Sequence, residues 1–125
     1  MRIVIIAYRY NLPELFMRRF LLFAALALTA QMGFAQDAQY TLTIKDHTFS
    51  PKELTVPAGQ KFKLVVVNQD KTTAEFESKP LGREKLIPGG KSITVNLGPL
   101  KPGRYEFVEE FHEKEPGAQG TLIVQ

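Results

Sequence analysis

Short runs in which apolar and polar residues alternate recur between residue 40 and the C-terminus. Tyr40, Leu42 and Ile44 form one such apolar series, and residues 92–97 form another. Alternation with a period of two predicts β-strands that bury one face. Turns rich in proline and glycine separate the runs, and no stretch has the periodicity of an amphipathic helix. The sequence therefore predicts an all-β fold for residues 36–125, a Greek-key β-sandwich of about seven to eight strands.

Three segments allow more specific predictions. Residues 61–68 carry apolar side chains at successive positions, which is typical of a central strand covered on both faces. Residues 46–51 contain charged residues and a proline, and we expect them to break the preceding strand. Residues 80–85 show no alternation, and we expect them to be irregular.

The first 35 residues have the layout of a secretory signal. A positive segment at 17–19 precedes an apolar run at 20–30, and small residues at Gly33 and Ala35 favour a cut after Ala35. The run is shorter than the ~20 apolar residues that a membrane-spanning helix needs. We predict an N-terminal extension and signal peptide at 1–35, with Met1 or Met17 as the start, and a periplasmic protein. A retained membrane anchor is the alternative.

Charge and cysteine content exclude several classes of function. Four of the 16 basic residues and one of the 13 acidic residues lie in 1–35, which leaves twelve of each in the predicted domain. The high isoelectric point therefore belongs to the leader, and we expect no nucleic-acid partner. The chain has no cysteine, which excludes disulfides and thiolate chemistry.

The stretch 103–113 reads as a strand that runs into a loop rich in carboxylates. The alternation of apolar residues ends after Val108, and four potential ligands follow within five residues: Glu109, Glu110, His112 and Glu113. Ordinary turns carry glycine, proline, asparagine or aspartate for backbone reasons. We therefore interpret the loop as a candidate metal site, although a solvated acidic loop would have the same sequence. The sequence does not tell which glutamate accompanies His112.

Three segments resemble the cupredoxins: residues 49–59, 67–70 and 100–107. The resemblance covers residues 39–125 and implies the cupredoxin sandwich. In blue-copper members of that family a cysteine, a histidine and a methionine follow the last of these strands. Here the cysteine position corresponds to Glu109, the next ligand to His112, and the upstream histidine to Ala74 or Glu75. The thiolate ligand of type-1 copper is therefore absent.

Four other segments give a narrower resemblance, at 46–51, 75–78, 84–89 and 110–113. They are similar to the cupredoxin-like domain of EfeO-type proteins and to the small periplasmic cupredoxin of FtrABCD-type ferrous-iron uptake systems. This resemblance implies that the protein binds Fe(II) and helps to oxidise it with Cu(II), a ferroxidase-like activity. It also implies a partner, either a periplasmic iron-binding protein or an inner-membrane iron permease.

The residue chemistry agrees with this resemblance. Imidazole suits Cu(II), iron and zinc, whereas carboxylates suit harder ions. Glu75 and Glu77 flank Phe76, so they should point away from the core if Phe76 points inward. The predicted metal ligands are His47, Glu75, Glu77, Glu84 and His112. Two alternatives have different chemistry: a periplasmic protein that binds or buffers copper without redox turnover, and a metal-free interaction module.

Overall fold

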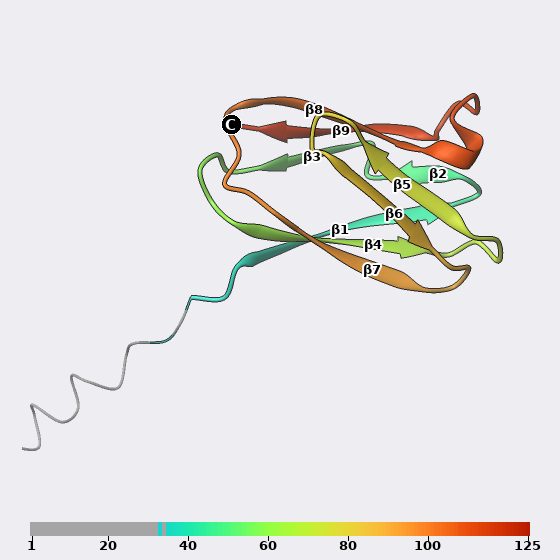
Figure 1. Ribbon diagram of the computed structural model, residues 1–125, viewed down its shortest axis with the longest axis horizontal. Coiled ribbons are helices and arrows are strands. Elements are labelled where there is room, and N and C mark those ends of the chain that lie inside the picture. The colour runs from blue at the N-terminus through green and yellow to red at the C-terminus, as the bar shows by residue number, and fades with distance from the viewer. Residues whose placement is uncertain (1–32, 34) are drawn as a thin grey trace, which may run out of the picture. The chain divides into compact units, whose positions relative to one another are not determined.

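The computed structural model describes residues 33 and 35–125, and residues 36–125 form one compact unit (Figure 1). Apart from Gly33 and Ala35, the predicted leader lies outside the described residues. The unit is built of nine strands and one short 3-10 helix, η1. Their bounds are β1 Ala38–Lys45, β2 Thr48–Ser50, β3 Glu53–Val56, β4 Phe62–Asn68, β5 Ala74–Ser78, β6 Arg83–Ile87, β7 Ser92–Leu97, β8 Gly103–Glu109, η1 Glu110–His112 and β9 Gln119–Val124.

The strands form two sheets that face each other across the core. One sheet has the order β2-β1-β4-β7 and the other β3-β9-β8-β5-β6. The pairs β1–β4 and β3–β9 are parallel, and every other pair is antiparallel. The prediction of an all-β sandwich is confirmed, with nine strands. The central position predicted for residues 61–68 is also confirmed, because β4 lies between β1 and β7.

Three aromatic rings join the two sheets at the centre of the core. Phe49 on β2 contacts Phe107 on β8 edge to face, with ring centroids 4.8 Å apart. Phe76 on β5 lies 5.5 Å from Phe107 and is fully buried. All the buried residues among those described lie between Leu42 and Val124, so the unit contains its own core. Burial of large aromatic side chains is the dominant stabilising term in a domain of this size.

Two segments differ from their predicted conformation. The strand interruption predicted for 46–51 is only two residues long, because Asp46 and His47 form a hairpin turn and β2 begins at Thr48. The irregular segment predicted for 80–85 contains the start of β6 at Arg83. β6 is an edge strand whose first four residues are all exposed, so its sequence carries no apolar alternation.

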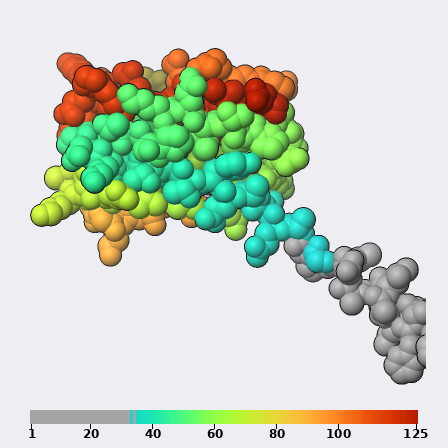
Figure 2. All heavy atoms as spheres, turned by 180° about the vertical axis from the view of Figure 1, so that it is seen from behind, coloured from blue at the N-terminus to red at the C-terminus, as the bar shows by residue number. Residues whose placement is uncertain are grey.

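The connections gather at two ends of the sandwich. The β1–β2 turn and η1 lie at one end, and the β7–β8 connection lies at the other, where β1 begins (Figure 1). From behind, the early strands cover much of the surface, with C-terminal segments along one edge (Figure 2). Among the described residues, no helix is long and apolar enough to cross a membrane.

Candidate metal centre

Glu109 is a buried carboxylate at the end of β8. Tyr105, Phe107 and Glu109 occupy successive inward positions of the strand, and Glu109 is 0% exposed. The expectation that the alternation ends after Val108 is therefore wrong for the backbone. The strand continues for one more inward position, and that position holds an acid in place of an apolar residue. A buried carboxylate needs hydrogen-bond donors to offset its lost hydration.

Those donors come from the backbone and from His112. Glu109 Oε1 accepts from the amide of Glu75 at 2.9 Å and from that of Phe111 at 3.3 Å. Glu109 Oε2 is hydrogen-bonded to His112 Nδ1. Because a carboxylate oxygen accepts hydrogen bonds, Nδ1 is assigned as the donor in this contact, and a neutral ring in that tautomer has the Nε2 lone pair free. Of the three glutamates left open by the sequence, Glu109 is hydrogen-bonded to His112 through Nδ1, which leaves Nε2 for a metal. None of the three belongs to the group of donor atoms around His112, where the carboxylate is that of Glu115.

His47 is held in the same way by Asp70. Asp46 and His47 both adopt left-handed backbone conformations, with φ of 50° and 56°. Their amides donate to the two carboxylate oxygens of Asp70 at 2.7 and 3.0 Å. His47 Nδ1 also lies 3.5 Å from Asp70 Oδ2. Positive φ at both central residues is what a two-residue hairpin turn requires, and the Asp70 carboxylate holds this turn in place.

The two imidazole rings stack on each other. Their centroids are 3.5 Å apart and their planes differ by 13°. Glu115, just beyond η1, completes a group in which one donor atom from each residue lies within 4.8 Å of the others. We call His47, His112 and Glu115 the histidine site. Two imidazoles and a carboxylate form a donor set suited to Cu(II), iron or zinc.

A second group of carboxylates lies on the outer face of β5 and β6. Phe76 points into the core, so its neighbours Glu75 and Glu77 point outward, as predicted. Glu77 is the cross-strand partner of Glu84. Carboxylate oxygens of Glu75, Glu84 and Glu110 lie within 4.8 Å of one another. We call these three residues the carboxylate site; its all-oxygen donor set suits harder ions.

Electrostatics within this group favour a bound cation. Partial burial, followed by the Glu84 carboxyl and the charge of Glu110, raises the pKa of Glu75. Partial burial and the charges of Glu77 and Glu84 raise the pKa of Glu110. Both shifts come first from lost hydration and then from the neighbouring carboxylates. A proton or a metal ion relieves the repulsion that those neighbours contribute.

This shift predicts a pH dependence of stability. A group whose pKa is raised by folding stabilises the protein below its unfolded pKa, and the contribution is lost as pH rises through the folded pKa. The metal-free Glu75→Gln variant should therefore be more stable than wild type at neutral pH and lose this advantage near about pH 4. Urea unfolding of wild type and variant at neutral pH and at about pH 4 measures this difference in stability. Glu106→Gln, on the exposed face of β8, is the control; an equal gain there would show that net charge alone is responsible.

The sequence left open whether the five predicted ligands form one site or two, and in the structure they fall into two groups. His47 lies with His112, and Glu75 lies with Glu84. Glu77 lies beside the carboxylate site, across from Glu84. η1 connects the groups, because Glu110 belongs to one and His112 to the other. Sequence reasoning missed Asp70 and Glu115, since only the fold shows that they lie near His47.

The upstream histidine position of the cupredoxin pattern holds no ligand directed at His112. Ala74 is buried in the core, at 3% exposed, and Glu75 points outward into the carboxylate site. The second imidazole comes instead from the β1–β2 turn. The pair of histidines is therefore assembled from a different element than the resemblance implied.

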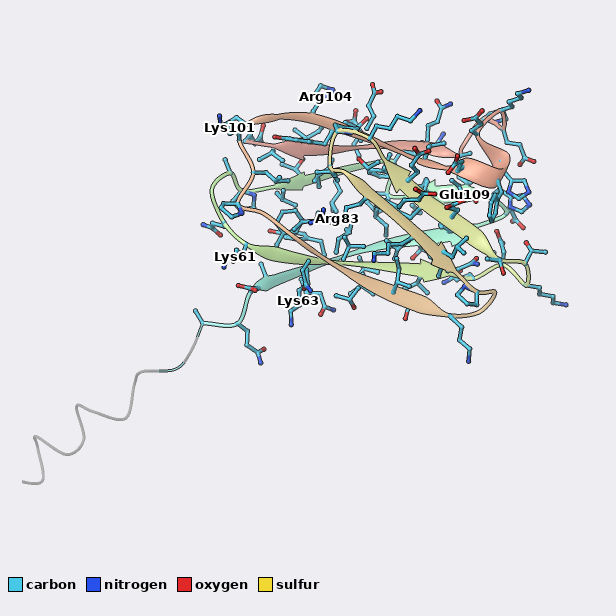
Figure 3. All side chains as sticks on the ribbon, viewed as in Figure 1. Lys61, Lys63, Arg83, Lys101, Arg104 and Glu109 are labelled. Atoms are coloured by element: carbon cyan, nitrogen blue, oxygen red, sulfur yellow. The ribbon has the colours of Figure 1, made fainter. Side chains whose placement is uncertain are left out.

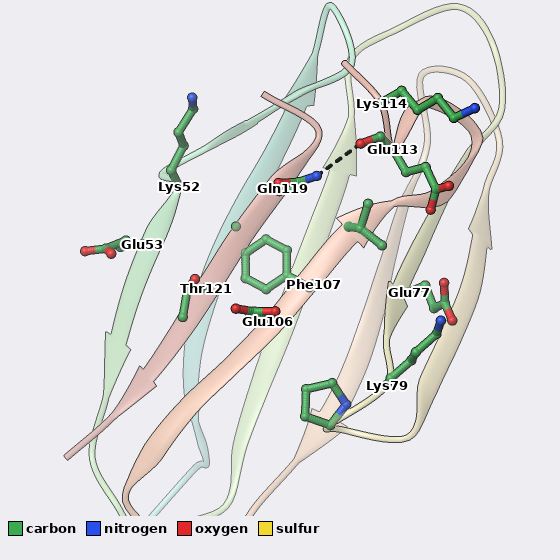
Figure 4. Close-up of a pocket in the computed structure, with 13 residues that line it drawn as sticks. Lys52, Glu53, Glu77, Lys79, Glu106, Phe107, Glu113, Lys114, Gln119 and Thr121 are labelled. Carbon is green, nitrogen blue, oxygen red and sulfur yellow. Dashed lines mark hydrogen bonds between the residues drawn. The ribbon is translucent and has the colours of Figure 1, made fainter. Parts of the chain in front are cut away.

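A surface groove with a volume of about 900 Å³ lies beside the carboxylate site (Figure 4). It forms where β5 and β8 diverge, since their pairing is limited to the Phe76–Glu109 and Glu77–Val108 pairs. Glu77 and Glu113 line it, and Gln119 Nε2 donates to the Glu113 carbonyl at 3.1 Å. Glu75, Glu84 and Glu110 do not line the groove, so it lies next to the carboxylate site through Glu77 alone.

Comparison with known families identifies the fold's relatives. The model of the Cupredoxin-like domain family matches residues 18–124. The chain belongs to this family. The match begins within the predicted leader, and the boundary after residue 35 remains a prediction. This cupredoxin-like chain is also 47% identical over 83 residues to Uncharacterized protein RP394 of Rickettsia prowazekii (strain Madrid E). That match covers 66% of this chain and 65% of the relative, just under two thirds of its length.

Solved structures support the same fold. The metal-binding domain of the Cu(I)-exporting P-type ATPase CopA of Streptococcus pneumoniae has a TM-score of 0.61 at 13% identity, covering 70% of this chain and 84% of that domain. Auracyanin A, a "blue" copper protein of Chloroflexus aurantiacus, has a TM-score of 0.60 at 16% identity, covering 72% and 100%. At these identities the likeness shows the fold alone. The narrower EfeO-type resemblance remains a prediction.

Proposed function

We propose that this cupredoxin-like protein is exported and assists ferrous-iron uptake, with Cu(II) at the histidine site and Fe(II) as substrate at the carboxylate site. The observation that carries the proposal is the pairing of two donor sets of different chemistry on one short helix. Glu110 and His112, two residues apart on η1, belong to the oxygen-rich and the imidazole group respectively. Oxygen donors favour iron, and imidazole favours Cu(II).

The histidine site fits copper by its chemistry. Asp70 and Glu109 each lie against a ring Nδ1, which orients His47 and His112 and makes them better ligands. The absence of cysteine predicts pale type-2 spectra without an intense thiolate band. Bound Cu(II) would supply a one-electron acceptor, and the protein's part is to hold it within reach of the iron.

The carboxylate site would bias iron towards its oxidised state. Glu75, Glu84 and Glu110, with Glu77 beside them, place several negative charges around one point. Coulomb attraction to such a cluster is stronger for Fe(III) than for Fe(II), because it scales with the charge of the ion. The cluster would therefore bind Fe(II) and lower the free energy of Fe(III) relative to that of Fe(II).

Two exposed apolar side chains beside this site favour a protein partner. Phe111, on η1 next to Glu110, is 53% exposed, and Leu86, the cross-strand neighbour of Glu75, is 58% exposed. Apolar side chains that flank a functional site commonly form part of a docking surface. The partner that receives the iron or the electron would be a periplasmic iron-binding protein or an inner-membrane iron permease.

A second candidate is copper binding or buffering without redox turnover. The composition of the histidine site favours this function. Its three donors include none of the glutamates of the carboxylate site, so it could bind copper without iron. An anaerobic experiment separates the two functions. Fe(II) is added to the Cu(II)-loaded protein, and the Cu(II) electron paramagnetic resonance signal is followed with time.

Our proposal predicts that one equivalent of Fe(II) removes the signal, as Cu(II) accepts one electron and Fe(III) forms. The Cu(II) signal should disappear more slowly in Glu84→Gln, which keeps the histidine site intact. In Glu106→Gln it should disappear at the wild-type rate. A Cu(II) signal that persists in wild type would favour the buffering function. Thermal stability and spectra that do not respond to either metal would favour the metal-free module.

A further inference from the structure

Positive side chains gather at the end of the domain opposite the two candidate metal sites. Figure 3 shows Lys61, Lys63 and Lys101 at the end where β1 begins, whereas Glu109 lies at the far end beside η1. The domain as a whole carries twelve bases and twelve acids, and Lys71 and Lys114 lie near Asp70 and His112, so the scarcity of acids is what distinguishes the opposite end. We define the basic end as four exposed residues: Lys61, Lys63, Arg83 and Lys101.

Lys63 and Arg83 meet at the edge strand β7. Lys63 on β4 is the cross-strand partner of Asn96. Arg83, at the start of β6 in the other sheet, donates from Nη2 to the Asn96 carbonyl at 3.5 Å. The two cations come from different sheets and share Asn96 as a neighbour.

Lys61 and Lys101 lie on two loops that are tied to each other. The amide of Gly59 donates to the Leu100 carbonyl at 2.9 Å. Gly98, with φ of 83°, packs so closely against the other loop that a Cβ there would lie 3.2 Å from the Lys61 Cα. The loops therefore present both lysines from a rigid base.

Few carboxylates neutralise this end. Segments 56–63 and 96–103 contain no aspartate or glutamate. Glu53 forms an ion pair with Arg104 at 2.9 Å, so its charge is balanced by a cation outside the basic end. Asp37, which directly precedes β1, is the remaining acid near the start of that strand. The four cations thus form a positive surface with little internal compensation.

The chain enters the domain at this surface. Ala38, the first residue of β1, is paired with Phe62, between Lys61 and Lys63. Only seven residues, 31–37, separate β1 from the apolar run at 20–30. Seven residues reach at most about 25 Å when fully extended. With the leader retained as a membrane anchor, the alternative named above, this linker would keep the start of β1 within about 25 Å of the apolar run.

We propose that the basic end binds the anionic phospholipid headgroups of a membrane surface. Lysine side chains suit such a surface, because they attract a layer of phosphates without requiring a shaped pocket. This orientation would direct both candidate metal sites away from the bilayer, towards soluble partners. The proposal does not require bound metal, but within the proposed function this orientation favours the periplasmic iron-binding protein over the inner-membrane permease as the partner.

Vesicle binding tests the proposal with residues 36–125, the unit that contains its own core. At low ionic strength the domain should sediment with vesicles of phosphatidylglycerol and phosphatidylcholine but not with phosphatidylcholine alone, and salt should release it. Lys61→Gln/Lys101→Gln should weaken partitioning about 25-fold, about fivefold for each cation. The matched control, Lys71→Gln/Lys114→Gln, changes net charge equally with two exposed lysines outside the basic end.

Site-specific labels report the orientation, because the chain has no native cysteine to interfere. A fluorophore on Gln60→Cys, beside Lys61, should be quenched by lipid-borne quenchers, and one on Gln69→Cys, near Asp70, should not. Equal loss of binding in the two double variants, or quenching at Gln69 only, would overturn the proposal. A domain that does not bind anionic vesicles would also overturn the proposal. If that domain instead forms oligomers that dissociate when salt is added, the basic end would bind acidic protein surfaces.

Discussion

Saturating Cu(II) should raise the melting temperature of the domain by about 10–20 °C. A metal that binds only the folded state at 100 times its Kd adds about 2.7 kcal/mol to the free energy of unfolding. For a domain of this size, each kcal/mol corresponds to roughly 4–8 °C. His112→Ala should abolish most of the increase, because it removes one imidazole and leaves His47 without its stacking partner. Differential scanning calorimetry with and without Cu(II) measures the effect.

Lys114→Ala is the matched control for this experiment, since Lys114 is exposed and only two residues beyond His112. It should keep the full shift. An equal response to Cu(II) in wild type and His112→Ala would show that His112 is an ordinary surface histidine.

The second large effect concerns the buried carboxylate. Glu109→Ala should lower the stability of the metal-free domain by about 3 kcal/mol, because it leaves buried polar groups without their partner. The groups affected are the amides of Glu75 and Phe111 and the Nδ1 of His112. At roughly 4–8 °C for each kcal/mol, the melting temperature should fall by about 12–24 °C. Chemical denaturation of wild type and variant provides the comparison.

Glu106→Ala is the control for Glu109→Ala, because Glu106 lies on the same strand with its side chain exposed. It should change stability by less than about 0.5 kcal/mol. Glu109→Gln, which keeps the shape, should recover part of the stability. Should Glu109→Ala be as stable as Glu106→Ala, the carboxylate would not organise this end of the fold.

The sequence predicted the fold because most strands bury one face and expose the other. β1, β7 and β8 alternate in sequence as they do in burial. β6 escaped prediction because an edge strand with four exposed residues leaves no hydrophobic pattern. β2 escaped because it is only three residues long and follows a turn of two non-glycine residues.

The candidate site was predictable in its residue types and less so in its grouping. The loop after β8 was singled out as a concentration of potential ligands, and the structure places Glu110 and His112 of that loop in the two candidate groups. The outward direction of Glu75 and Glu77 followed from the inward direction of Phe76. The partnership of Asp70 with His47 spans 23 residues of sequence, and no local pattern reveals such a contact. The role of Glu109 was hidden for a related reason. The apolar and polar residues stop alternating after Val108, whereas the side chains of the strand continue to alternate between inward and outward as far as Glu109.

The replacement of a thiolate by a carboxylate has a chemical consequence for this scaffold. By the family resemblance, Glu109 stands where blue-copper proteins carry cysteine. In this structure it serves as a hydrogen-bond acceptor for His112. The remaining donors around η1 are imidazole nitrogens and carboxylate oxygens, which are harder ligands than sulfur. Such a centre is better matched to Cu(II) and iron than to Cu(I).

The central claim is that η1 joins two sites of different chemistry. Calorimetric titration of Cu(II) and Mn(II), an air-stable substitute for Fe(II), into wild type, His47→Ala and Glu84→Gln tests it most directly. Glu84 lies on the exposed edge strand, so its substitution should not disturb the fold. Our account predicts that His47→Ala loses mainly Cu(II) affinity and Glu84→Gln mainly Mn(II) affinity, each by tenfold or more, about 1.4 kcal/mol. Parallel losses of both metals in both variants would mean a single shared site and would contradict the account.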